Sequence, residues 1–567
     1  MTAGGNRCGY MSHDRVLLRA WVGLAAALVL AGCGGGSEGG GGTTSPPPPT
    51  PPPPAVPPVV TTPTAVRVSQ ATPFGNGCLS VPAAATIYRD AEVEPHLTID
   101  RVSPNHLVAA WQQDRLSDGG ALGLVTAVSV DGGTSWSGHR SAPFSQCAGG
   151  SFARVSDPWV SVAGSTVIQA GIAFTGAALT SGARSSVLVS RSIDGGFNWS
   201  PSVAVADDDG SQYFNDKESV TIDPTDSRYA YVVWDRLDRE DRGPTILARS
   251  VDGGASWSPP VAIYSPGGAG RQTIGNVALV APSGVVFTFF TELEPAPGDP
   301  ARSVGHLALV RSFDKGLSWS VPARIANLLS VGTRLPLQPQ TVVRAGEILG
   351  TFAVNPVTGT LYAAWQDSRF SGGARDSIAF AQSQDAGATW SAPVRVNADP
   401  SVPAFTPTIA VLPDGAIGIT YYDFRQAGSA SFQPTEFWLA TSRDGVTWRE
   451  TRLAGNFDLL NAPNASGLFL GDYQGLAGSG STFVALYARV NNGDPANRTD
   501  IFADRVDASV GAAGAAVAPA RESPKDTVPL WTPAAQERVG DNLAAVRGLR
   551  RSQWQQWLEA PNLPPPQ

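Results

Sequence analysis

The chain has 567 residues, of which 62 are glycine and 47 are proline, while charged residues make up only 16%. This excess of turn formers and shortage of charge argues against a helical protein and favours many short strands joined by tight turns. A formal net charge of −8, with no block of Lys or Arg, argues against nucleic acid as a partner.

The first residues have the pattern of an export signal. Two arginines precede an apolar run from Trp21 to Leu30, which is too short to span a bilayer as a helix. The run leads into Ala31-Gly32-Cys33, which resembles the bacterial lipoprotein signal, in which the cysteine is lipidated and becomes the mature N-terminus. The resemblance implies a signal peptide over 1–32, lipid attachment at Cys33, and a place in the bacterial cell envelope, at the outer membrane or the periplasmic face.

A Gly-rich and then Pro-rich segment follows the cysteine. Its composition predicts a disordered tether over residues 33–72, because nothing in it can bury a core. Polyproline II rises about 3.1 Å per residue, so the prolines of 46–58 form a semi-rigid spacer of roughly 40 Å. We expect this tether to hold the following domain clear of a membrane surface.

One short pattern, Ser-x-Asp-x-Gly-x-x-Trp, then recurs six times, the last copy one residue shorter. Successive copies begin 58 to 71 residues apart, and their aspartates are Asp131, Asp194, Asp252, Asp314, Asp385 and Asp444. Asp accepts backbone N–H bonds at a turn, Gly supplies a positive φ, and Trp covers the turn. Each copy is therefore predicted to be a β-hairpin turn, with a structural role.

The pattern resembles the Asp-box of the sialidase superfamily. The resemblance implies an all-β, sialidase-like β-propeller of four-stranded blades, with each box between the third and fourth strands, on the face away from the active site. It covers about residues 80–506, and the predicted propeller domain is 73–507.

Spacing arithmetic favours seven blades, six of them with boxes, and a six-bladed propeller is the alternative. Strand-like segments continue to Asp500–Val506 without a further box, so an N-terminal strand, Val81–Arg89, is predicted to close the last blade. Cys78 and Cys147 lie near the ends of successive outer strands, where a disulfide can form. Residues 508–567 are predicted to be an Ala/Gly linker and a C-terminal helix over 533–558.

Polar residues gather at the blade ends that face away from the boxes. Asp and Arg end four second strands, in Asp114-Arg115, Asp235-Arg236, Asp367-Ser-Arg369 and Asp423-Phe-Arg425. The loops before the first strands add Glu94-Pro95-His96, Asp157-Pro158-Trp159, Asp216-Lys217-Glu218 and Gly471-Asp472-Tyr473. Arg forks suit a planar carboxylate, so these residues either line a ligand pocket or pair with neighbouring blades as staples.

The superfamily resemblance implies roles for some of these residues. Sialidases hold the substrate carboxylate with three arginines and use a Tyr–Glu nucleophile pair and an Asp acid. Mapped by position, the arginines are Arg115, Arg236, Arg369 and Arg425, the nucleophile pair is Tyr422 or Tyr473 with Glu218, and the acid is Asp114. The Arg-Ile-Pro motif of the family is absent from the first blade, where this chain has Glu94-Pro95-His96.

The sequence thus predicts an exo-α-sialidase-like glycoside hydrolase acting on acidic sugars at the cell envelope. The alternative is a non-catalytic propeller that binds glycan or protein partners. No cofactor or metal is predicted, because the four cysteines and five histidines lack CxxC and HxxxH spacing. The run Asp207-Asp208-Asp209-Gly210 lacks the alternation of a calcium loop and is predicted to be a solvated turn.

Overall fold

The computed structural model describes residues 64–79, 85–508 and 532–555. The predicted signal peptide, Cys33 and most of the tether lie outside these residues. Within them, no helix has the length and apolar character needed to cross a membrane.

Most strands form successive groups of four antiparallel neighbours. The first four groups are β2 (Glu92–Ile99), β3 (Leu107–Arg115), β4 (Ala121–Ser129) and β5 (Ser137–Ser141); β6 (Arg154–Ala163), β7 (Thr166–Thr175), β8 (Arg184–Ser192) and β9 (Val203–Asp209); β10 (Tyr213–Ile222), β11 (Ala230–Asp238), β12 (Thr245–Ser250) and β13 (Val261–Tyr264); and β14 (Gln272–Val280), β15 (Val286–Ala296), β16 (Asp299–Ser312) and β17 (Ala323–Leu328).

The second half of the chain repeats this arrangement. Its groups are β20 (Thr351–Val354), β21 (Leu361–Asp367), β22 (Ser377–Ser383) and β23 (Val394–Arg395); β24 (Ala404–Val411), β25 (Ile417–Asp423), β26 (Pro434–Ser442) and β27 (Arg449–Asp458); and β29 (Gly475–Ser479), β30 (Thr482–Val490), β31 (Thr499–Asp507) and β1 (Val66–Arg67). A three-stranded sheet contains β18 (Thr333–Leu335), β19 (Gln338–Arg344) and β28 (Leu468–Phe469). The short 3-10 turns are η1 (Gln146–Ala148), η2 (Arg369–Ser371) and η3 (Leu459–Asn461).

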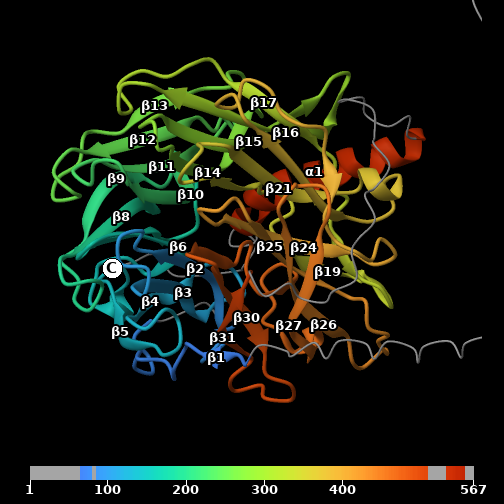
Figure 1. Cartoon of the computed structure of the whole chain (residues 1–567), viewed down its shortest axis with the longest axis horizontal. Helices are drawn as coiled ribbons and strands as arrows, with labels where there is room; N and C mark the ends of the chain where they lie inside the picture. The colour runs from blue at the N-terminus through green and yellow to red at the C-terminus, as the bar shows by residue number, and fades with distance from the viewer. Residues whose placement is uncertain (1–63, 80–84, 509–531, 556–567) are drawn as a thin grey trace, which may run out of the picture. The chain divides into compact units, whose positions relative to one another are not determined.

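The groups follow one another around a centre in chain order, as Figure 1 shows. The first two groups are joined into one sheet by a single pair, Ala121 with Val155. This all-β architecture of many antiparallel four-stranded sheets is consistent with a propeller.

An N-terminal strand does complete the last group, but it is not the predicted one. Strand β1 pairs with β31, with Val66 opposite Ala503. It lies before the predicted domain start at residue 73. Of the predicted strand 81–89, the described residues form only an isolated bridge from Ile87 to Leu116. The correct segment is two residues long, too short to show a period-two pattern in the sequence.

All six repeated motifs form turns between the third and fourth strands of their groups. In each, the serine hydroxyl accepts the backbone N–H of the glycine at 2.8–2.9 Å. In the copy at Asp252, hydrogen bonds from the hydroxyl and N–H of Ser256 lower the pKa of the carboxyl to about 2. The Ser, Asp and Gly of the pattern therefore bond to one another within the turn, which gives them a structural role.

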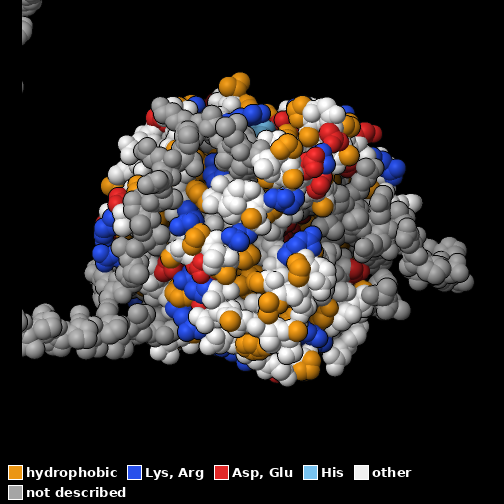
Figure 2. Space-filling view, turned by 90° about the vertical axis from the view of Figure 1, so that its right-hand side faces the viewer, with side chains coloured by type: hydrophobic (Ala, Val, Ile, Leu, Met, Phe, Trp, Pro, Cys, Tyr) orange, Lys and Arg blue, Asp and Glu red, His pale blue; other side chains and the backbone are white. Residues whose placement is uncertain are grey.

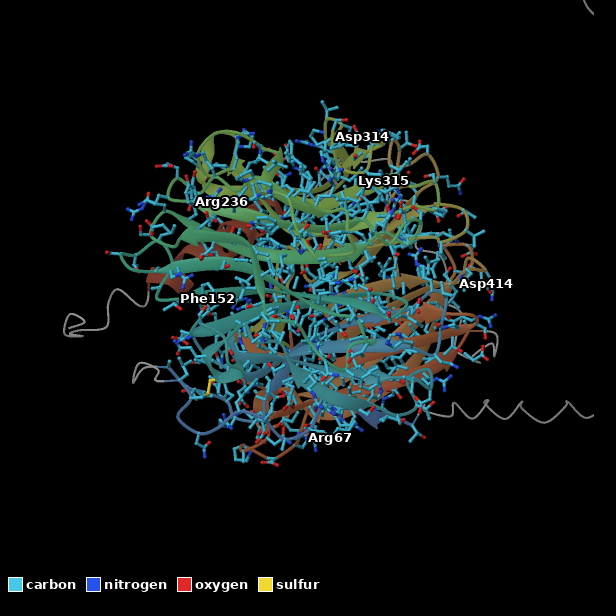
Figure 3. The ribbon with its side chains drawn as sticks, turned by 90° about the vertical axis from the view of Figure 1, so that its left-hand side faces the viewer. Arg67, Phe152, Arg236, Asp314, Lys315 and Asp414 are labelled. Atoms are coloured by element: carbon cyan, nitrogen blue, oxygen red, sulfur yellow. A yellow bond between two sulfur atoms is a disulfide. The ribbon has the colours of Figure 1, made fainter. Side chains whose placement is uncertain are left out.

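The motif turns lie at one end of each sheet. Antiparallel neighbours place the turn between strands three and four at the same end as the turn between strands one and two. Gly253 accordingly donates to the carbonyl of Arg228 in the β10–β11 turn at 2.8 Å. Figure 3 shows Asp314 and Asp414, from turns of both kinds, toward one side and Arg236 toward the other. The loops before each first strand must therefore lie at the opposite end.

We expect Ser250→Ala to lower the free energy of unfolding by about 1–2 kcal/mol, because it leaves the buried N–H of Gly254 without its acceptor. Ser256→Ala, which removes an exposed hydroxyl that donates to Asp252 in the same turn, is the matched control and should cost less than Ser250→Ala, because water can replace an exposed hydrogen bond. Urea unfolding of both variants measures the difference. Equal losses would show that the serine acceptor does not stabilise the turn.

Helix α1 (Pro533–Gln555) packs against β16. Its Ala535, Val539 and Leu543 belong to the hydrophobic core there, and Arg302 forms an ion pair with Asp541 at 2.9 Å. The structure thus has a C-terminal helix docked on the β-domain. Figure 2 shows the side of the molecule that lies at the right in Figure 1, where basic, acidic and hydrophobic side chains are intermingled.

Candidate functional site

Three polar residues interrupt the first strands of the first three groups at equivalent places. Glu94, Asp157 and Lys217 have φ of 56°, 55° and 47°, and the register of β2, β6 and β10 shifts at each of them. A bulge with a left-handed residue turns a side chain away from the ordinary alternation of a strand. Such strain in non-glycine residues clusters at functional sites.

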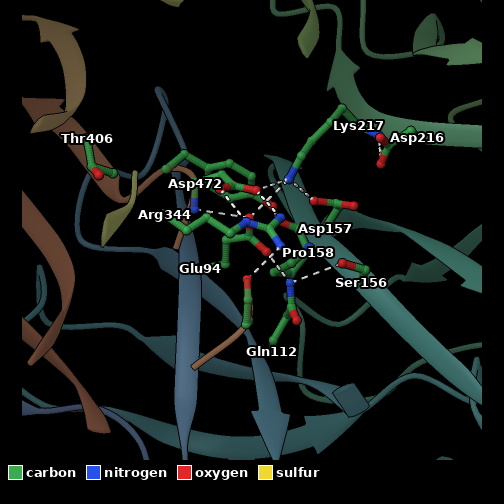
Figure 4. Close-up of polar contacts among 12 residues, drawn as sticks. Glu94, Gln112, Ser156, Asp157, Pro158, Asp216, Lys217, Arg344, Thr406 and Asp472 are labelled. Carbon is green, nitrogen blue, oxygen red and sulfur yellow. Dashed lines mark hydrogen bonds and ion pairs between the residues drawn. The ribbon is translucent and has the colours of Figure 1, made fainter. Parts of the chain in front are cut away.

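Three carboxylate side chains converge on the ammonium of Lys217, as Figure 4 shows. Its Nζ lies 3.1 Å from Glu94 Oε1, 2.5 Å from Asp157 Oδ1 and 2.9 Å from Asp472 Oδ2. Asp472 comes from the segment just before β29, so residues far apart in the chain meet here. We call Glu94, Asp157, Lys217 and Asp472 the central cluster.

Two arginines border the central cluster. Arg344 binds Asp472 with two bonds, from Nε at 3.0 Å and from a terminal nitrogen at 2.6 Å. Arg115 is 2% exposed and donates to Gln112 at 2.6 Å, while its Nε has no hydrogen-bond partner among the described residues. Both guanidinium groups lie over the ring of Phe469, at 4.8 and 4.6 Å from its centroid.

The environment separates the pKa values of the carboxyl groups. Burial raises the pKa of Asp157 above its usual range, although Lys217 opposes the shift. Burial also raises the pKa of Glu94, to about 7. For Asp472 the effect of burial is outweighed by Arg344 and Lys217, which hold its pKa well below the usual range. The cluster therefore contains both a carboxyl that favours its proton and one that stays ionised.

A cavity of about 220 Å³ opens onto this arrangement. Its polar lining includes Arg115, Asp157, Lys217, Arg344 and Asp472, and its apolar lining includes Phe174 and Phe214. A lining that combines charged groups with aromatic rings suits a polar ligand with an apolar face, such as a sugar.

Of the four predicted arginines, only Arg115 lines this cavity. Arg236 forms an ion pair with Asp208, a carboxylate of β9. Arg369 and Arg425 bind their own aspartates, Asp367 at 2.8 Å and Asp423 at 2.6 Å. These three arginines are held at the sheets and do not converge; only the Arg236–Asp208 pair joins neighbouring groups, as the staple alternative expected. Because each is neutralised within its own or the preceding group, the predicted four-arginine clamp does not form.

The predicted acid and one predicted nucleophile also lie elsewhere. Asp114 is buried, accepts a hydrogen bond from Thr72 at 2.6 Å and pairs with Arg89 at 2.8 Å. Tyr422 is fully buried in the hydrophobic core, where its hydroxyl donates to the carbonyl of Ala488 at 2.7 Å. Neither residue lines the cavity beside the central cluster.

Tyr473 and Glu218 lie near the central cluster but line a second cavity. The hydroxyl of Tyr473 donates to the carbonyl of Pro158 at 3.4 Å. Neither carboxyl oxygen of Glu218 has a hydrogen-bond partner among the described residues. The two side chains therefore do not form the hydrogen-bonded pair that activation of a tyrosine requires.

Sequence reasoning noted the loops that supply the central cluster but gave its carboxylates no role, and it missed Arg344. One sequence feature marks two members of the central cluster, Glu94 and Asp157. A polar residue precedes proline in the first strands of three groups, at Glu94, Asp157 and Thr406, and all three have positive φ. Arg344 ends β19, outside the four-stranded groups, so the repeat offered no guide to it.

Comparison with solved structures finds glycoside hydrolases at low identity. The GH93 α-L-arabinofuranosidase of Fusarium graminearum is 13% identical, with a TM-score of 0.42 over 79% of this chain and 98% of that one. A Hadza microbial sialidase is 16% identical, with a TM-score of 0.38 over 71% and 73%. The Trypanosoma rangeli sialidase is 13% identical, with a TM-score of 0.38 over 78% and 58%. The sequence matches no protein-family model.

Proposed function

We propose that the chain is a glycoside hydrolase with a seven-bladed, sialidase-like propeller fold, which removes terminal acidic sugars at the cell envelope. One observation carries the proposal: Asp157 and Asp472 line one cavity beside two arginines, and their pKa values are displaced in opposite directions. The seven four-stranded groups support the blade count. Attachment through Cys33 rests on the N-terminal sequence.

The two carboxyl groups suit the two tasks of glycoside hydrolysis. Asp157, which burial holds toward the protonated form, donates its proton to the glycosidic oxygen as the leaving group departs. Asp472 stays ionised and stabilises the positive charge that develops at the anomeric carbon. Both bind the same ammonium, so they are close enough for the roughly 5 Å separation of retaining enzymes.

The arginines favour an acidic sugar. Burial and then repulsion from Arg344 lower the pKa of Arg115 to about 10. An anionic group bound between the two guanidinium groups relieves this repulsion, and a carboxylate matches the fork of donors that each arginine presents. The unpartnered Nε of Arg115 is a donor that such a carboxylate can use.

Turnover of fluorogenic glycosides tests the proposal, with an α-sialoside, a β-glucuronide and an α-arabinofuranoside as substrates. We expect release from an acidic sugar, and Asp157→Asn should lower kcat at least about 100-fold, the typical contribution of a general acid. Asp208→Asn, which removes a carboxylate that pairs with Arg236 away from the cavity, should leave turnover unchanged. Equal turnover of wild type and Asp157→Asn would contradict the assignment.

A specific observation favours a second function, glycan binding without catalysis. Every carboxylate of the central cluster is already bonded to Lys217, and Asp472 also to Arg344. Such a saturated network can serve as a rigid floor of a binding pocket. In that case the same panel gives no turnover, while free sugar acids still bind in titration calorimetry.

A further inference from the structure

A second cavity, of about 230 Å³, adjoins the first but has different walls. Its lining comes mainly from the first strands of successive groups, including β2, β6, β10, β14 and β24. Of the residues that the structure describes, only Lys217 and Leu349 line both cavities. The second cavity is therefore a separate compartment, which the proposed hydrolysis does not use.

Two side chains in its wall carry buried polar atoms that have no hydrogen-bond partner among the described residues. Glu218 is 2% exposed, and neither of its carboxyl oxygens accepts or donates a hydrogen bond among the described residues. Asn276 is 1% exposed; its carbonyl accepts from Thr245 at 2.8 Å, but its amide nitrogen has no partner there. Burying such groups unpaired is unfavourable, so a cavity lined by both residues indicates a polar occupant.

The charges around Glu218 indicate the sign of that occupant. Burial raises the pKa of Glu218 well above its usual range, and Asp157 and Asp216 add to this effect. The ammonium of Lys217, which is bonded to the three carboxylates of the central cluster, opposes this rise in pKa but is outweighed by burial. A positively charged ligand would give Glu218 the partner that the protein does not provide.

Aromatic rings form another part of the wall. His96 stacks on Trp159 with ring centroids 3.9 Å apart, and Tyr473 meets Trp159 edge-on at 5.5 Å. Burial lowers the pKa of His96 to about 3, so this imidazole is neutral and does not repel a cation. Aromatic faces beside a carboxyl group are the usual means of recognising organic cations.

We propose that this second cavity binds a small organic cation, with its charged nitrogen at Glu218 and its body against Trp159 and Tyr473. The amide of Asn276 donates to an acceptor on the ligand. The cavity volume restricts the ligand to a small molecule. The site is distinct from the sugar pocket, and its occupancy does not depend on glycosidase activity.

Titration calorimetry of the full chain with benzylammonium chloride tests the proposal, with benzyl alcohol as the neutral probe of the same shape. We expect benzylammonium to bind at least tenfold more tightly than the alcohol. Glu218→Gln should abolish this difference, whereas Asp208→Asn should retain it. Failure of benzylammonium to bind, equal binding of the alcohol, or unchanged binding to a folded Glu218→Gln variant would each overturn the proposal.

If Glu218→Gln does not fold, a crystal structure of the wild-type protein with benzylammonium tests the proposed cation site. The ammonium should lie within hydrogen-bond distance of Glu218, with the ring against Trp159. Density for the probe in the sugar pocket alone, or at the surface alone, would show that the cavity does not select cations.

Discussion

Lys217→Met should lower the free energy of unfolding by about 3–5 kcal/mol at neutral pH, the usual effect of removing one partner from a buried ion pair. The substitution leaves Glu94, Asp157 and Asp472 buried around a missing ammonium, and among the described residues only Asp472 keeps a second ion-pair partner, Arg344. Methionine fills a similar volume, so the loss reports charge and not packing. Urea unfolding measures it.

The loss of unfolding free energy caused by Lys217→Met should be larger at high pH than at low pH. Burial already raises the pKa of Glu94 to about 7 and that of Asp157 above its usual range, and removing Lys217 raises both further. A carboxyl whose pKa is raised on folding stabilises the fold at low pH and loses that contribution as pH rises through the folded-state pKa. The deficit of the variant should therefore be largest above about pH 7 and shrink toward pH 4.

Arg443→Met is the matched control for this experiment. Arg443 pairs with Asp414 at 2.9 Å, but the two side chains are 58% and 45% exposed. Exposed pairs contribute little, so this variant should lose less than about 1 kcal/mol at any pH. A similar small loss for Lys217→Met, without pH dependence, would mean that the ammonium does not hold the carboxylates together.

The disulfide should have an effect of comparable size. Cys78 and Cys147 are bonded, with a sequence separation of 69 residues, as the sequence allowed. Restricting a loop of this length in the unfolded chain is worth about 4 kcal/mol in the chain-entropy model. The bond also ties the segment that carries β1 to the loop after β5, at η1.

Replacing both cysteines by serine should therefore lower the unfolding free energy by about 4 kcal/mol. Dithiothreitol should bring the wild type to the level of the double variant and leave the variant itself unchanged. Unfolding in guanidinium chloride with and without the reductant measures both. Coincident curves for wild type and variant under oxidising conditions would contradict the stabilising role.

The fold could be predicted because its strongest signal is local and repeated. Each turn of the kind at Asp252 is completed by hydrogen bonds between residues at most four apart in the chain, so the same short pattern marks the same point in six groups of strands. The closing strand could not be located, because β1 depends on pairing with β31, more than 400 residues away, and carries no pattern of its own.

The site was only partly predictable, for a physical reason. The sequence shows which residues can form ion pairs but not which residue each of them pairs with. Arg369 and Arg425 bind the aspartates two residues before them, which removes them from any shared clamp. The charges that do converge, such as Asp157 and Lys217, are directed inward by left-handed bulges that only the register of the strands reveals.

The most direct test of this account is a crystal structure of the protein with N-acetylneuraminic acid. We expect the sugar to lie in the cavity of about 220 Å³, with its carboxylate hydrogen-bonded to Arg115 and its anomeric oxygen near Asp157. A sugar bound elsewhere, or bound in this cavity with its carboxylate directed away from both Arg115 and Arg344, would contradict the central claim.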